Sequence, residues 1–125
     1  MGKCVRIMVV DDDYNMRALV SRVLELEDYE VIQATDGNSA LALLEERRPD
    51  LVILDVMMPG LNGFQILFLI KKRYNIPVII VTAMSEASSY PDASDIGADG
   101  YLRKPFNLRD LVARVRARLG ETAGE

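Results

Sequence analysis

Short runs of apolar, mostly β-branched residues alternate along this chain with segments of helical periodicity. The runs predict five strands, near residues 4–10, 30–35, 51–55, 77–82 and 100–103. Between and after them, apolar residues recur at the spacing of helices that bury one face. Strand and helix units that alternate in this way, without repeats or linkers, predict an α/β domain whose parallel sheet is covered by helices on both faces.

Two of the predicted helices have clear starting residues. Asp13 precedes the first helix and Asn107 precedes the last, and side chains of both types accept hydrogen bonds from the free amides of a helix start. The buried face predicted for the first helix consists of Met16, Leu19, Val20, Val23 and Leu24. The face predicted for the last helix consists of Leu108, Leu111, Val112, Val115 and Leu119.

The helix that follows Gly63 carries an unusual pair of apolar residues. Its sheet-facing stripe is predicted to be Ile66, Leu67 and Ile70. This stripe leaves Phe68 and Leu69 on the side that usually faces water. Exposed apolar neighbours can be incidental, or they can form a contact patch for a partner or a second copy, and the sequence leaves both interpretations open.

Two segments between predicted strands remain, and only the first of them shows the apolar periodicity of a helix. A helix is predicted from about Asn38 to Arg47, ended by Pro49. The segment 85–95 reads SEASSYPDASD and has little apolar periodicity. There we expect a long loop and a short helix that starts near Pro91. An ordinary helix, formed because packing overrides propensity, is the alternative.

Composition limits the classes of function. The 125 residues correspond to one domain, expected at 1–120, with 121–125 as a flexible tail. The chain has 15 basic and 19 acidic residues and no basic patch interleaved with aromatic residues, so this domain is not expected to bind nucleic acid. No apolar run approaches the ~20 residues of a membrane span.

Cysteine and histidine usage narrows the chemistry further. The single cysteine, Cys4, excludes an internal disulfide and suits a reducing, cytoplasmic location. Because Cys4 falls at the start of the first predicted strand, we expect it to be buried. The chain has no histidine, which excludes a mechanism that uses a histidine base or phosphocarrier of its own.

Chemically active side chains follow four of the predicted strands. Asp11 and Asp12 follow the first strand, Asp55 ends the third, Thr82 ends the fourth and Lys104 follows the fifth. Ligands of an open parallel sheet bind outside the carboxyl ends of its strands, where the strand order reverses. The acids, the hydroxyl and the lysine are therefore expected to converge on one edge of the sheet.

The three carboxylates in this set predict a metal site. In a doubly wound sheet of order 2-1-3-4-5 the first and third strands are neighbours, so Asp11 and Asp12 lie beside Asp55. Carboxylates at such distances repel one another unless a cation compensates, and hard oxygen ligands favour Mg²⁺. Each residue alone could be a turn, a strand end or a surface charge, but together they predict a site for a divalent metal and a phosphoryl group.

Four motifs of the chain resemble the receiver domain of two-component response regulators. They are VVDDD (9–13), LVILDVMMPGLNG (51–63), VIIVTA (78–83) and GADGYLRKPF (97–106). The likeness extends from about Lys3 to Leu119 without an insertion. It implies a flavodoxin-like, doubly wound (βα)5 three-layer sandwich and a phosphorylation-controlled signalling switch, which catalyses only its own phosphoryl transfer and slow dephosphorylation.

The resemblance also implies a role for each residue of the site. Asp55 would accept phosphate from a sensor histidine kinase or a small phosphodonor. Lys104 would pair with the phosphoryl group. Mg²⁺ would be held by Asp11, Asp12, Asp55 and the backbone carbonyl of Met57.

The same resemblance implies a switch and partners. Thr82 and Tyr101 would move together and change the surface formed by the helix expected near Pro91, the strand at 100–103 and the last helix. A downstream effector or output domain would recognise that surface, and a homodimer is possible. The last helix resembles receivers that precede winged-helix domains, whereas the segment 85–95 does not, so the presence of an effector domain stays open.

Met57 and Met84 depart from the usual pattern of similar receivers. They lie two residues after Asp55 and Thr82, at positions that modulate how water reaches the acyl phosphate, often with polar side chains. Two apolar methionines predict slow self-dephosphorylation, unless they only fill gaps in the packing.

The motifs of the chain also bear on three other classes of protein. A hydrolase of the haloacid-dehalogenase type would resemble DxDxT after the first strand, and a nucleotide-binding enzyme would need GxxxxGK or GxGxxG; none of these motifs is present. The remaining alternative is a receiver-like interaction module that acts without phosphorylation, and a mass shift on Asp55 separates it from the switch.

Overall fold

Five parallel strands form a single sheet in the order β2-β1-β3-β4-β5. The computed structural model describes residues 4–56, 63–82, 100–103 and 105–120. The strands are β1 (Arg6–Val10), β2 (Glu30–Ala34), β3 (Leu51–Asp55), β4 (Val78–Thr82) and β5 (Gly100–Arg103). The predicted strands and the predicted order 2-1-3-4-5 are confirmed.

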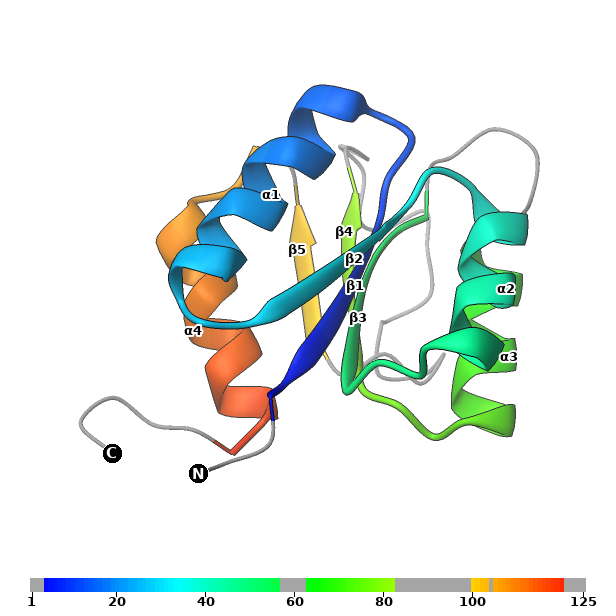
Figure 1. Cartoon of the computed structure of the whole chain (residues 1–125). Coiled ribbons are helices and arrows are strands. Elements are labelled where there is room, and N and C mark those ends of the chain that lie inside the picture. The colour runs from blue at the N-terminus through cyan, green and yellow to red at the C-terminus, as the bar shows by residue number, and fades with distance from the viewer. Residues whose placement is uncertain (1–3, 57–62, 83–99, 104, 121–125) are drawn as a thin grey trace.

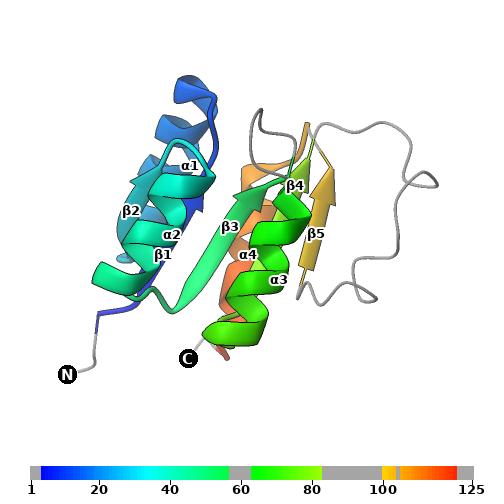
Figure 2. The same cartoon turned by 90° about the vertical axis from the view of Figure 1, so that its right-hand side faces the viewer.

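Helices cover both faces of this sheet (Figures 1 and 2). They are α1 (Tyr14–Leu26), α2 (Gly37–Glu46), α3 (Gly63–Arg73) and α4 (Leu108–Arg118). α1 and α4 lie on one face, and α2 and α3 lie on the other. The result is the expected flavodoxin-like, three-layer arrangement. The short helix predicted near Pro91 lies outside the described residues.

Two apolar clusters, one on each face of the sheet, form the core. Successive strand residues point to opposite faces, so β1 sends Met8 and Val10 towards α2 and α3, and Ile7 and Val9 towards α1 and α4. All five residues of β3 and of β4 are buried because helices cover both sides of these central strands. Packing on both faces therefore fixes the position of the central strands, whose carboxyl ends carry the candidate site residues.

Side-chain caps fix where three helices begin. Asp13 accepts hydrogen bonds from the amides of Asn15 and Met16, and Asn107 accepts one from the amide of Arg109, so both predicted caps are confirmed. Asp36, which the sequence reasoning overlooked, caps α2. The amide of Ser39 donates to its carboxylate at 2.7 Å, and this bond lowers the pKa of Asp36 from 3.8.

Two burial predictions are wrong. Leu19 is 48% exposed, because α1 packs on the sheet through Arg17, Val20, Ser21 and Leu24, a ridge that turns Leu19 towards water. Cys4 is exposed, because β1 begins two residues later, at Arg6.

On α3 and α4, the side of the helix that was predicted to be buried is the side that packs on the sheet. Ile66, Leu67 and Ile70 of α3 are fully buried, and Phe68 is 59% exposed. Leu69 is half-buried, so the predicted apolar pair is only partly open to water. In α4, Leu111 and Val115 are fully buried, and the other predicted members of that face are half-buried.

The basic residues of the last helix occupy a largely solvated side. One of them, Arg116, forms an ion pair with Glu27, which ties α4 to the end of α1. Among the helices of the described part of the chain, none has the length and apolarity that a membrane crossing requires.

Candidate functional site

Three carboxylates meet where β1 and β3 end. One oxygen each of Asp11, Asp12 and Asp55 lies within 4.8 Å of the others. The register explains why Asp11 and Asp55 meet, because Val10 of β1 pairs with Leu54 of β3 and each acid is the next residue of its chain segment, while Asp12 directly follows Asp11. The structure thus brings together the three acids that the sequence reasoning selected.

Burial increases the electrostatic repulsion among the three carboxylates of this cluster. Asp11 is 3% exposed and Asp55 is 5% exposed, whereas Asp12 is open to solvent. Negative charges at this separation repel one another, and burial weakens the screening by water. A divalent cation relieves the repulsion. Carboxylate oxygens with solvent on one side suit Mg²⁺, which keeps several of its waters when a protein binds it. The donor set therefore fits the expected metal.

Backbone hydrogen bonds hold the loop that carries Asp11 and Asp12. The amide of Asp11 donates to the carbonyl of Ala34 at 3.2 Å, which extends the pairing of β1 with β2 by one residue. The amide of Asp13 donates to the Asp11 carboxylate at 2.9 Å. Because Asp13 also caps α1, the acidic loop is fixed at both ends, and the positive end of the helix dipole lies beside it.

Arg17 of α1 also holds this loop through a hydrogen bond, a role that the sequence did not predict. Its guanidinium is buried and donates to the carbonyl of Asp11 at 3.0 Å and to the side-chain carbonyl of Gln33 at 2.9 Å. It also lies over the ring of Tyr14, 5.6 Å from the ring centre. A signal was present in the sequence, because Arg17 shares the i, i+3, i+4, i+7 ridge that buries Val20 and Leu24.

Thr82 ends the strand next to Asp55. Val81 pairs with Asp55 across β4 and β3, so Thr82 lies one residue beyond that pair, and it is buried. Tyr101 is half-buried and packs against the cluster under α2 and α3. Since Ile80 pairs with Tyr101, and Thr82 points to the same face as Ile80, Thr82 and Tyr101 share one face of the sheet.

Three other residues expected at the site lie outside the described residues. They are Lys104, Met57 and Met84. The carboxylates and Thr82 are thus located at one edge, while the positions of the lysine and of both methionines relative to them remain predictions from the sequence.

Comparison with known proteins agrees with this geometry. Residues 7–116 match the family model described as the response regulator receiver domain. The DNA-binding response regulator MtrA of Mycolicibacterium paratuberculosis is 40% identical over 91% of this chain and 51% of its own length. The probable transcriptional regulator ycf27 of Cyanophora paradoxa is 38% identical over 94% of this chain and 49% of its own length. The chain spans about half the length of these curated relatives.

Solved structures show the same likeness in three dimensions. A CheY-like response regulator receiver domain protein from Methanospirillum hungatei has a TM-score of 0.87 at 31% identity, with 94% of this chain and 95% of that chain covered. The receiver domain of NtrX from Brucella abortus has a TM-score of 0.85 at 34% identity, with 93% and 99% covered.

Proposed function

The chain belongs to the response regulator receiver domain family, and from that premise we propose that it is a Mg²⁺-dependent phosphorylation switch whose acceptor is Asp55. Receiver domains are signalling domains of two-component systems rather than conventional enzymes. The observation that carries the proposal is the approach of Asp11, Asp12 and Asp55 to within 4.8 Å at the edge where Thr82 also ends its strand. Residues 1–120 are the proposed receiver and 121–125 a tail.

The proposed reaction is a phosphoryl transfer to a carboxylate. An oxygen of Asp55 attacks phosphorus and forms an acyl phosphate, while the bond from phosphorus to the donor breaks. The donor is the phosphohistidine of a sensor kinase, which leaves as imidazole, or a small acyl phosphate, which leaves as a carboxylate. Mg²⁺, when bound, neutralises charge on the transferred group.

The chain's own residues supply the rest of the site. Asp11 and Asp12, together with Asp55 and the backbone carbonyl of Met57, hold the metal in this proposal. Lys104 pairs with the phosphoryl oxygens after transfer, and the Thr82 hydroxyl donates a hydrogen bond to one of them. The burial of Asp11 and Asp55 supports this scheme, because electrostatic interactions are stronger where water is excluded.

Movement of Thr82 towards the phosphoryl group provides the proposed switch. Tyr101 lies on the same face of the sheet and would turn inward into space that Thr82 leaves. The changed surface consists of the segment expected to be helical near Pro91, β5 and α4. A downstream effector or output domain would read it.

The partners follow from this scheme. The names of MtrA and ycf27 suggest an output at the level of transcription, yet we do not propose contact between this domain and nucleic acid. A sensor histidine kinase as phosphodonor implies a cytoplasmic location, which stays a prediction.

Intact-mass spectrometry after incubation with Mg²⁺ and acetyl phosphate tests the proposal. The wild-type chain should gain one phosphoryl group, and Asp55→Asn should gain none. Asp36→Asn is the matched control, since Asp36 is an exposed acid at the same edge whose cap an asparagine can keep. Labelling of Asp55→Asn at wild-type level would exclude Asp55 as the acceptor.

Absence of labelling in the wild type would leave a site that needs its cognate kinase or an interaction module that acts without phosphate. Titration with Mg²⁺ and beryllofluoride separates these two cases. A receiver that needs its kinase still binds both ions, whereas a phosphate-independent module binds neither.

A further inference from the structure

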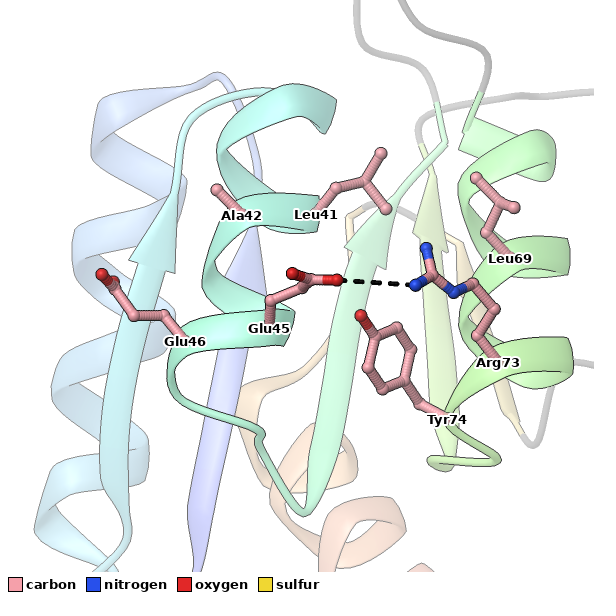
Figure 3. A pocket seen from close by; sticks show the side chains of 7 residues that line it. All are labelled: Leu41, Ala42, Glu45, Glu46, Leu69, Arg73 and Tyr74. Carbon is pink, nitrogen blue, oxygen red and sulfur yellow. Dashed lines mark hydrogen bonds and ion pairs between the residues drawn. The ribbon is translucent and has the colours of Figure 1, made fainter.

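A hollow of about 600 Å³ lies between α2 and α3, on the outer side of these helices (Figure 3). Half-buried apolar side chains line it, namely Leu41 of α2, Leu69 of α3 and Tyr74 just after α3. None of these residues belongs to the proposed phosphorylation site. The hollow is therefore a second surface feature that the switch does not explain.

Charges of opposite sign are separated on the two walls of this hollow. Glu45 and Glu46 line the hollow from α2, and Arg73 lines it from α3, where Lys72 is its neighbour in the sequence. Among the residues that line the hollow, each helix therefore contributes charge of a single sign, and the guanidinium of Arg48, just after α2, lies over the ring of Tyr74 at the end of the hollow. A partner of uniform charge would be attracted by one wall and repelled by the other.

One ion pair crosses the mouth of the hollow. The guanidinium of Arg73 lies 3.5 Å from the carboxylate of Glu45, as the dashed line in Figure 3 shows. Both side chains are largely exposed, and exposed pairs of this kind contribute little to stability. The two residues can therefore exchange partners at small cost.

An exposed aromatic ring stands on α3, the helix that forms one wall of the hollow. Phe68 is 59% exposed, and the ammonium group of Lys72 lies 5.4 Å from its ring centre. The exposed lining of α2 includes a small residue, Ala42, which leaves room for a ring to pack against it. Aromatic anchors that fill a recess in the opposite surface dominate the energy of many protein interfaces.

We propose that this face, which comprises α2, α3 and the hollow between them, pairs two copies of the chain about a two-fold axis along the groove. Rotation about that axis places α2 of each copy opposite α3 of the other, so the acidic wall meets the basic wall twice. Phe68 of each copy then covers Ala42 and the hollow of the other. The proposal is independent of phosphorylation at Asp55.

Analytical ultracentrifugation over a range of concentrations tests the pairing. The Asp55→Asn chain should form dimers as its concentration rises, with phosphorylation excluded. Phe68→Arg should weaken the dimer by about 10-fold or more, because it replaces the central anchor by a charge. Leu26→Arg is the matched control, since Leu26 is an equally open apolar residue on α1, and it should leave association unchanged.

Charge reversal gives a second, independent test. Glu45→Arg and Arg73→Glu should each weaken self-association, because both variants place like charges on facing walls. The double variant restores opposite charges across the interface and should recover the dimer, and the two single variants should associate with each other when mixed. Circular dichroism verifies that each variant is folded.

Three results would overturn the proposal. They are a wild-type chain that stays monomeric at every concentration, a dimer that Phe68→Arg does not weaken, and failure of the charge-swapped double variant to recover association. Recovery cannot follow from altered folding alone, because the double variant differs more from the wild type than either single variant does.

Discussion

The guanidinium of Arg17 donates a hydrogen bond of 3.0 Å to the backbone carbonyl of Asp11. Through its second bond, to Gln33 of β2, the same side chain connects α1 with the loop that carries the acidic pair and with the neighbouring strand. Groups that orient the ligands of a metal commonly matter almost as much as the ligands themselves. We therefore regard Arg17 as a positioning residue for the proposed Mg²⁺ site.

Substitution of Arg17 by methionine tests this role. The Asp11 carbonyl loses a donor in a buried place, so the free energy of unfolding should fall by about 1–3 kcal/mol. Mg²⁺ affinity should fall about 10-fold, because the loop is no longer held. Urea denaturation and a Mg²⁺ titration followed by NMR measure the two effects.

Arg22→Met is the control for that experiment, because Arg22 lies on the exposed side of the same helix. It should change neither quantity. A folded Arg17→Met chain with wild-type Mg²⁺ affinity would contradict the positioning role, whatever its stability.

Repulsion within the acidic cluster gives a prediction about metal removal. In a chelator, Asp12→Asn should raise the free energy of unfolding by on the order of 1 kcal/mol, because one of three neighbouring charges is lost. Added Mg²⁺ should stabilise the wild type by mass action and stabilise the variant much less. Thermal denaturation with and without Mg²⁺ measures both effects.

Asp28→Asn serves as the control for the Asp12 variant. Asp28 is an exposed acid far from the cluster in sequence, and asparagine tolerates its positive φ of 71°. A similar gain in stability for both variants would mean that net charge, and not the cluster, is responsible.

The lifetime of the acyl phosphate should depend on Met57 and Met84. Two apolar side chains placed two residues after Asp55 and Thr82 would keep water from the phosphoryl group. Met57→Asn and Met84→Glu should therefore shorten the lifetime, which loss of label from purified phosphoprotein measures. Met8→Leu, a volume-conserving change in the buried core, is the control. An unchanged rate in both polar variants would mean that the methionines only fill space.

Much of the fold was predictable because burial on two sides leaves a strong pattern. The strand Leu51–Asp55 begins with four apolar residues, as expected of a central strand that helices cover on both sides, and it ends in an acid at the edge where ligands of such sheets bind. The acids at the ends of β1 and β3 could be placed together for the same reason, since strand order alone brings them to one point.

The contacts of α1 were harder to predict. Apolar periodicity assigned Leu19 to the buried face, yet Arg17 occupies part of that face and Leu19 lies in water. A one-dimensional pattern ranks residues by apolarity, whereas Arg17 is buried because backbone and amide acceptors at the sheet edge satisfy its guanidinium. Those acceptors come from the residue that follows β1 and from β2, and only the three-dimensional structure shows them.

Protonation of Asp36 should weaken the start of α2. The hydrogen bond from the amide of Ser39 holds the pKa of Asp36 below 3.8 in the folded chain. A lowered folded pKa means that this stabilisation is fully present above the unfolded pKa and disappears as pH falls through the folded value. Below pH 3.8 the wild type should therefore lose stability relative to Asp36→Asn, and the difference between their free energies of unfolding should change in favour of the variant.

Urea denaturation at neutral pH and at several values below 3.8 measures that shift. The comparison between the two chains cancels the protonation of the other carboxylates, which both chains share. A difference that does not change with pH would mean that the folded chain does not favour the ionised form of Asp36.

Close approach of α3 to the end of β3 makes Gly63 sensitive to any side chain. A Cβ at Gly63 would lie 2.4 Å from the Cα of Val56, which directly follows Asp55. Gly63→Ala should therefore destabilise the chain by about 1–3 kcal/mol, the usual cost of an overpacked site. The higher helix propensity of alanine offsets at most ~1 kcal/mol of this loss.

The same variant should slow phosphorylation. The new methyl group would displace the backbone of Val56, and Val56 directly follows the proposed acceptor Asp55. Urea denaturation and labelling by acetyl phosphate measure the two effects, and Gln65→Ala, an exposed change two residues further along α3, is the control. A Gly63→Ala chain as stable as the wild type would show that α3 can shift away from Val56. Labelling at an unchanged rate in a destabilised chain would show that the displacement at Val56 does not alter the position of Asp55.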